Sequence, residues 1–202
     1  MTAGVSGAAD PASPPLGPRH GGYSVRLNIL SKLALAVALI TVAAAHDWPQ
    51  LQGKAVGLRL VFYPLAALIV PACWRLRSTP GPYPHGADAI LVIPFTIDLA
   101  GNIFNLFDTV TWWDDANHLL NWALLTAAAG LLLRRTALPP VACFGLAIGF
   151  GASTAILWEL GEYLSFVRHS AERFTAYRDT MGDEALGLTG SVLGGWLATR
   201  DR

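Results

Sequence analysis

The stretch WWDDANHLLNWALLTAAAGLLLRR, residues 112–135, decides the class of fold. Its apolar part, residues 115–133, is about as long as the roughly 20 residues that a helix needs to cross a bilayer. Asp114, His118 and Asn121 follow one another at helical spacing, so a helix places them on one face. The stretch therefore predicts a membrane helix with a polar stripe at its beginning.

Further apolar segments extend this pattern along the 202-residue chain. Hydrophobic residues make up 53% of the sequence, charged residues 14%, and the mean hydropathy is +0.43, which is too apolar for an ordinary soluble domain. We therefore predict an all-α polytopic transmembrane bundle of about six helices, at residues 27–45, 56–74, 87–107, 115–133, 140–166 and 180–198.

Residues 1–22 precede the first apolar segment and are rich in proline, glycine and alanine. This composition cannot bury a core, so we expect a disordered N-terminal tail there and a six-helix membrane domain over residues 23–202. The formal net charge is zero and there is no basic run, which argues against nucleic acid as a partner.

The arginines predict the orientation of the helices in the membrane. With six crossings, one side of the membrane holds Arg19, Arg26, Arg75, Arg77, Arg134, Arg135, Arg200 and Arg202. The opposite side holds fewer basic residues, and the richer side is the cytoplasmic one, so both termini are expected in the cytoplasm. Lys32 and Arg59, near the ends of apolar segments, are expected to snorkel to the interface.

Small residues on the last two segments predict close packing between helices. Gly187, Gly190 and Gly194 line one face of the sixth segment, and Gly145 and Gly149 form a GxxxG pattern on the fifth. The alternative is that such patterns are simply common in glycine-rich apolar chains.

Polar stripes also occur on the other three C-terminal segments. They consist of Asp98, Asn102 and Asn105 on the third, Glu159 and Glu162 on the fifth, and Asp179 and Asp183 at the start of the sixth. In the predicted topology all of them lie in the outer half of the membrane or at its surface. Because ionisable groups inside a membrane are costly, such a cluster indicates a site, a proton relay or an ion path.

Each stripe also has a purely structural interpretation. Asp114 can share a metal with His118 or orient it as a base, and it can equally cap its helix. Two glutamates one turn apart imply a protonated carboxyl, a bound cation or a wet cavity. Asp179 and Asp183 are ordinary residues for a helix N-terminus.

The deepest stripe has two interpretations of its own. Asp98 and Asn102 are candidates for a proton or ion relay, and they can equally form hydrogen bonds between helices.

Carboxylates with one imidazole make a ligand set for a divalent cation such as Mg²⁺, Mn²⁺ or Zn²⁺. The predicted metal ligands are Asp114, His118, Glu159, Glu162, Asp179 and Asp183. Of these, Glu159, Glu162 and His118 are the catalytic candidates. No classical metalloprotease, nucleotide-binding or nucleophile-elbow motif is present.

Three stretches together resemble the YjdF-like family of bacterial inner-membrane proteins. They are WWDDANHLLNWALLTAAAG, AILWELGEYLSF and YRDTMGDEALGLTGSVLGG, and the matching motif positions are Asp114, His118, Glu159, Glu162, Asp179, Thr180 and Asp183. In a looser form the layout is similar to the VanZ-like membrane proteins. The resemblance implies a multi-pass fold in the bacterial cytoplasmic membrane and a common site, but no particular reaction.

Three functions remain open from the sequence. The first is a metal-dependent membrane enzyme that acts on a lipid or envelope precursor. The second is a small proton- or ion-coupled transporter with Asp98, Glu159 and Glu162 as its relay. The third is a structural membrane factor whose polar cluster holds the bundle together. A lipid-accessible slot beside the cluster would favour the enzyme, and a dry, fully paired cluster would favour the structural role.

Overall fold

The computed structural model describes residues 19–76 and 81–200, so residues 1–18 of the expected tail lie outside the described residues. The long helices are α1 (Arg19–Ala44), α2 (Val56–Leu76), α3 (His85–Ile103), α5 (Trp113–Leu133), α6 (Pro140–Ser165) and α7 (Ala176–Thr199). Short helical turns are η1 (Pro49–Leu51), α4 (Leu106–Thr109), η2 (Val167–His169) and η3 (Ala171–Phe174). Helix α1 begins at Arg19, so the last four residues of the expected tail, residues 19–22, are helical.

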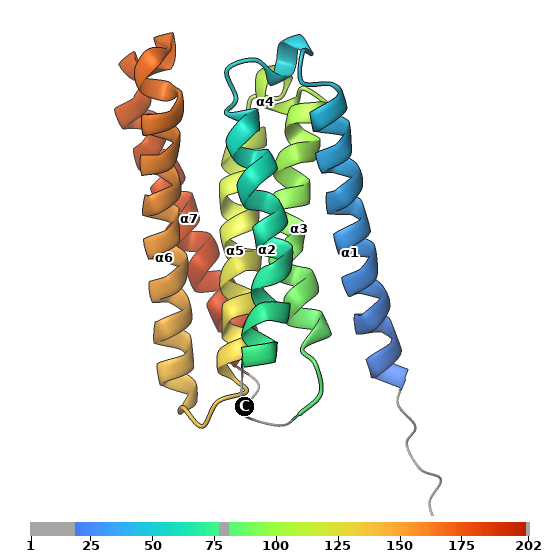
Figure 1. Ribbon diagram of the computed structural model, residues 1–202. Coiled ribbons are helices and arrows are strands. Elements are labelled where there is room, and N and C mark those ends of the chain that lie inside the picture. Colours follow the sequence, from blue (N-terminus) through green and yellow to red (C-terminus); the bar gives the residue numbers. More distant parts are fainter. Residues whose placement is uncertain (1–18, 77–80, 201–202) are drawn as a thin grey trace, which may run out of the picture.

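The long helices run alternately up and down, so that consecutive helices are antiparallel (Figure 1). The end of α7 and the beginning of α1 lie at one end of the bundle, and α4 lies at the other (Figure 1). We call the latter the α4 end. It holds the beginnings of α2, α5 and α7 and the ends of α1, α3 and α6, and these are the turns that carry most of the polar stripes.

A long helix is present at each of the six predicted places, and this confirms the all-α polytopic class. Among the described residues, α1, α2, α3, α5 and α6 are long and apolar enough to cross a membrane. Helix α7 is not among them, because acidic residues in its first turns and many glycines lower its hydropathy. With 24 residues it would still extend for about 36 Å, enough for the hydrocarbon core.

The third predicted helix is shorter than expected. Helix α3 ends at Ile103, and Asn105 has a φ of 57°, in the left-handed region that asparagine tolerates better than most residues. The chain turns there and starts the short α4. Asn105 therefore does not continue the face of Asp98 and Asn102, and the predicted stripe of three residues is reduced to two.

Helices α5 and α7 approach each other closely through glycines. A Cβ atom at Gly190 would collide with the backbone of Leu119, and one at Gly194 would collide with the backbone of Ala123. The predicted small-residue face of the last helix is therefore a real packing face. Gly145 and Gly149, in contrast, have open space at the Cβ position. On α6 it is Gly151 that packs closely, because a Cβ there would collide with Thr126 of α5 and Ser191 of α7.

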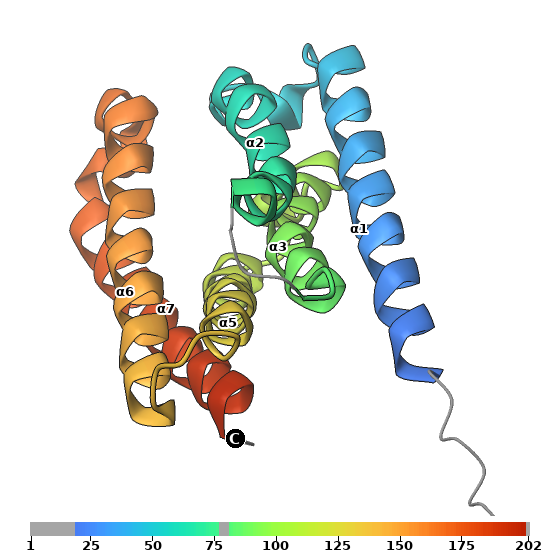
Figure 2. The same ribbon diagram turned by 60° about the horizontal axis from the view of Figure 1, so that its bottom comes forward.

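The bundle has its apolar core on the side of α1, α2 and α3, with α5 between this group and the pair α6 and α7 (Figure 2). The buried cluster there includes Leu35, Val42, Tyr63, Val92 and Leu99. Large apolar side chains are also exposed on the outside of α1, α2, α6 and α7, as expected for helices that face lipid.

Candidate functional site

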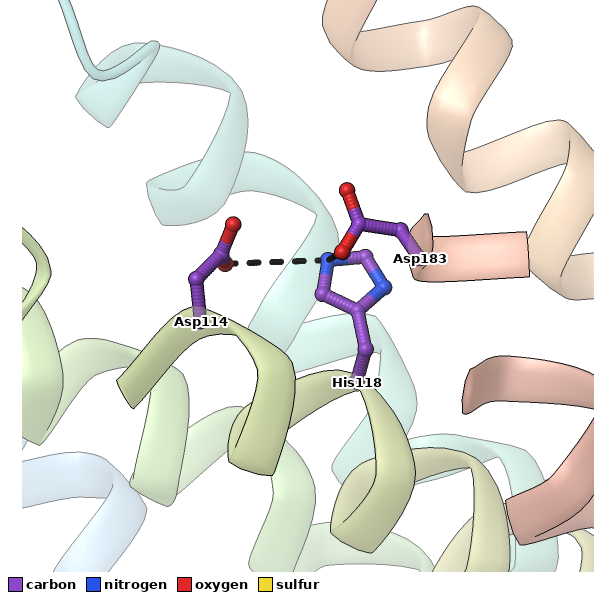
Figure 3. Close-up of side chains that lie close together, drawn as sticks. All are labelled: Asp114, His118 and Asp183. Atoms are coloured by element: carbon purple, nitrogen blue, oxygen red, sulfur yellow. Dashed lines mark ion pairs between the residues drawn. The ribbon is translucent and has the colours of Figure 1, made fainter. Parts of the chain in front are cut away.

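His118 lies in the second turn of α5, at the centre of the polar cluster, and its side chain is 6% exposed. The ring nitrogen Nε2 lies 3.7 Å from Oδ1 of Asp114 and 3.9 Å from Oδ1 of Asp183, which comes from α7. Figure 3 shows both carboxylates turned toward this nitrogen. Asp114 faces the imidazole from one turn earlier on the same helix, and the close contact between α5 and α7 at the glycines brings the sequence-distant Asp183 to it as well.

The other ring nitrogen of His118 faces α6. Its Nδ1 atom lies 3.7 Å from Oε1 of Glu159. The Glu159 side chain is nearly buried, and its Oε2 accepts a hydrogen bond of 3.2 Å from the Thr180 hydroxyl of α7. Its Oε1 is buried and has no hydrogen-bond partner among the described residues. Oε1 of Glu159 is therefore placed to accept a hydrogen bond from a protonated Nδ1 of His118.

Two sets of ligand atoms meet at His118. One consists of Asp114, His118 and Asp183, the other of His118, Glu159 and Glu162, and within each set the atoms lie within 4.8 Å of one another. A neutral imidazole has only one acceptor nitrogen, so His118 can complete one of the two sets at a time. The set on Nε2 leaves Nδ1 protonated and directed at Glu159.

Arg59 at the beginning of α2 is a member of the cluster that the sequence did not assign to it. We expected its side chain to snorkel to the interface, which is wrong: the residue is 8% exposed. Its Nε donates to Oδ2 of Asp98 at 2.9 Å, and Nη2 lies 3.4 Å from Oδ1 of the same carboxylate. Tyr63 also donates to Oδ2 of Asp98, at 2.6 Å. Asp98 is therefore a buried carboxylate with a cation and a phenol as partners.

The remaining predicted residues lie at the edge of the cluster. Asn102 is buried and donates to the backbone oxygen of Asp98 in its own helix. Asp179 is exposed and belongs to neither set of ligand atoms. Asn121 donates to Asn117 at 2.7 Å on the same helix.

A cavity of about 340 Å³ opens at the α4 end above these residues. Its lining includes the cations of Lys54 and Arg59 and the carboxylates of Asp98, Asp108, Asp114, Glu162 and Asp179. Lys54 donates to Asp108 at 2.6 Å, and Nη2 of Arg59 lies 4.0 Å from Oε1 of Glu162. The carboxylates outnumber the cations, so the cavity favours a cationic ligand.

A second polar cluster, which was not predicted from the sequence, lies at the opposite end of the bundle. Asp88 in the first turn of α3 is fully buried, and its Oδ2 accepts hydrogen bonds from Asn28 at 2.9 Å, Lys32 at 2.6 Å and Tyr83 at 2.6 Å. Lys32 therefore connects α1 to α3 and does not simply reach for the interface. Burial and the hydrogen bond to Asp88 raise the pKa of the Tyr83 phenol, which keeps it a donor.

Both overlooked pairs had a signal in the sequence. Lys32 and Arg59 stand near the ends of apolar segments, and the third segment carries an aspartate in the same half of the membrane in each case, Asp88 for Lys32 and Asp98 for Arg59. A charge inside a membrane helix usually has a partner, so these two aspartates are the counter-ions that the sequence offers.

Comparison with known proteins agrees with this architecture. A family model described as "Predicted membrane protein (DUF2238)" matches residues 27–202, and the chain belongs to this family of membrane proteins. No curated protein and no solved structure matches the chain. The family and the apolar helices together show a multi-pass membrane protein.

Proposed function

We propose that this membrane protein is a metal-dependent enzyme that acts on a lipid or envelope precursor, with a divalent metal held by Asp114, Nε2 of His118 and Asp183. One observation carries the proposal. Nε2 faces two carboxylates while Nδ1 faces the unpartnered Oε1 of the buried Glu159. A ligand histidine whose second nitrogen points at a carboxylate is the usual arrangement in metal sites.

The distances between the ligand atoms are compatible with a metal on the Nε2 side of His118. Ligand atoms around Zn²⁺ at about 2.1 Å in tetrahedral geometry are about 3.4 Å apart. The separations of 3.7 and 3.9 Å at Nε2 are therefore only slightly wider than a metal requires. One imidazole and two carboxylates suit Zn²⁺ or Mn²⁺ and leave coordination positions for water and substrate.

Each residue of the cluster receives a role in this proposal. The metal would polarise a phosphoryl or acyl oxygen of the substrate and lower the pKa of a bound water. Glu159 orients His118, and Glu162, which lines the cavity, is the candidate base. Asp98 holds Arg59 in place. Because its carboxylate accepts hydrogen bonds from both Arg59 and Tyr63, Asp98 is better suited to positioning Arg59 than to acting as a proton relay.

Metal analysis of purified protein tests this proposal. We expect about one equivalent of divalent metal in the wild type, and loss of that metal in His118→Ala and in Asp183→Asn. The matched control is Asp115→Asn, an exposed carboxylate beside Asp114 in the same turn of α5, and it should keep the metal. If Glu162→Gln loses the metal while Asp183→Asn keeps it, the metal belongs to the other set of ligands. If the wild type holds no metal, the enzyme proposal fails and the structural role of the cluster is favoured.

The membrane topology belongs to the same proposal. We infer six crossings, with α7 as the sixth, in the bacterial cytoplasmic membrane, and the α4 end on the outer side. The arginine-rich ends near Arg75 and Arg134 lie at the opposite end of the bundle from α4, which supports this orientation (Figure 1). The relation to YjdF-like and VanZ-like proteins stays a hypothesis that rests on the motifs around His118, Glu159 and Asp183.

Reporter fusions test the orientation. Fusions after Leu76 and after Arg135 should report the cytoplasm, and a fusion after Trp48 should report the outer side. A reversed pattern would place the site on the cytoplasmic face and would contradict the proposed localisation of the chemistry.

A further inference from the structure

An apolar groove of about 310 Å³ lies between α2 and α6, beside the polar cavity. Its walls include Leu58 and Phe62 from α2 and Leu157 and Gly161 from α6. The side chains of Leu58, Phe62 and Leu157 are also among the exposed large apolar residues, so the groove opens toward the outside of the bundle. Figure 2 shows α2 and α6 standing apart on this side. In a membrane this opening faces hydrocarbon, and a lipid chain can enter it without crossing water.

The groove and the polar cavity meet at a common wall. Arg59, Trp158, Glu162 and Phe166 line both of them. The guanidinium of Arg59 stands over the Trp158 ring at 5.9 Å, so the cation marks the border between the two compartments. Moving inward from the lipid, a ligand meets apolar side chains first, then the Arg59 guanidinium with the Glu162 carboxylate beside it, and then the acidic cavity with His118.

Arg59 keeps the capacity to bind a ligand at this border. A guanidinium has five N–H donors, and Asp98 and the backbone oxygen of Lys54 accept only some of them. Glu162 lies 4.0 Å from Nη2, beyond hydrogen-bond distance. The planar donor fork of arginine matches phosphate oxygens, and this match is stronger in surroundings of low dielectric constant.

We propose that the substrate is a membrane lipid with a phosphate attached directly to its apolar part. Its hydrocarbon chain lies in the groove between α2 and α6, its phosphate is bound by Arg59, and the rest of its headgroup reaches the cavity beside His118. The order of compartments in the protein matches the order of chain, phosphate and headgroup in such a lipid. This inference gives a substrate class to the proposed enzyme and rests on that function for its chemistry, but the binding step itself does not need the metal.

Photolabelling of the full-length protein in an uncharged, phosphate-free detergent tests the inference. The probes are a phosphatidic acid and a diacylglycerol that carry the same diazirine on the same acyl chain, both used in the presence of chelator. We expect the phosphatidic acid to label the groove segments, residues 55–62 and 157–166, at least about tenfold more strongly than the diacylglycerol does. This ratio is what one charge-assisted hydrogen bond to the phosphate would add to the affinity.

Two variants separate the groove from the phosphate contact. Gly161→Phe fills the groove, and since nothing lies within 4 Å of the Cβ position the fold should tolerate it. Labelling should then fall by about tenfold, while the matched control Gly149→Phe on the same helix, also with open space at its Cβ, should label like the wild type. The double variant Arg59→Gln/Asp98→Asn removes both charges together and should erase the preference for phosphatidic acid.

The possible results decide the inference without reference to the metal. Equal labelling by the two probes, or unchanged labelling in Gly161→Phe, overturns it. Preferential labelling of the groove by phosphatidic acid supports the inference even if the metal analysis finds no metal. In that case only the proposed metal-dependent chemistry is contradicted. If the protein contains metal but both probes label it equally, the result supports the metal site and contradicts this substrate class.

Discussion

Replacing Arg59 by Met is expected to destabilise the folded protein by about 3–5 kcal/mol, the largest effect of any single substitution considered for this chain. The variant keeps an unbranched, flexible side chain, shorter than that of arginine, and removes the only described cation within hydrogen-bond distance of the buried Asp98 carboxylate. An uncompensated charge on a carboxylate that is only 5% exposed is poorly solvated and therefore costly. The loss is measured as the shift of the unfolding midpoint in a denaturing detergent titration.

Two further variants show whether the charge is the cause. Arg59→Gln/Asp98→Asn removes both charges and should recover most of the lost stability, since the pair and its neutral replacement differ little in net free energy. Tyr63→Phe removes only a hydrogen bond to Asp98 and should cost about 0.6 kcal/mol, as is usual between membrane helices. If Arg59→Met and Tyr63→Phe have equal effects, the pair contributes only ordinary packing.

Chelation of the metal is expected to have the second largest effect. A ligand at a hundredfold excess over its Kd stabilises the folded state by about 2.7 kcal/mol, so a strong chelator should lower the unfolding temperature of the wild type, and added Mn²⁺ or Zn²⁺ should restore it. Asp183→Asn should show no response to either treatment, because it lacks a ligand on the Nε2 side of His118.

The same measurement distinguishes ligands from the residue that orients them. Glu159→Gln should still respond to the metal, with an affinity about 10–100-fold weaker, because it acts on His118 through Nδ1. Asp115→Asn should respond like the wild type, since this exposed carboxylate is in neither set of ligand atoms. A wild type that is unaffected by chelator and by added metal contradicts the proposed site.

Much of the site could be predicted from the sequence, because its pattern is local. A helix places residues three and four apart on one face whatever surrounds it, so Asp114 and His118 had to share a face, as did Glu159 and Glu162. The depth of each stripe followed from counting residues along apolar segments at a fixed rise per residue. These two rules were sufficient to expect the polar groups of α5, α6 and α7 at the same end of the bundle.

Other features depended on interactions that no local rule contains. The end of α3 at Ile103 required Asn105 to adopt a left-handed conformation, which a helical pattern through residue 107 did not indicate. The glycines with a packing role on α6 could not be told from Gly145 and Gly149, since both kinds stand in apolar helices and only the neighbouring helix distinguishes them.

The sequence by itself determined that the chain forms long apolar helices with polar stripes, because hydrophobic length and helical periodicity are properties of each segment alone. The tertiary structure alone decided which partners those stripes meet. The rotation and approach of α7 against α5, set by Gly190 and Gly194, bring Asp183 to Nε2 of His118, and the placement of α6 brings Glu159 to Nδ1. The position of α2 buries Arg59 against Asp98 at the border of two cavities, because a membrane-buried charge is stable only where another helix supplies its counter-ion.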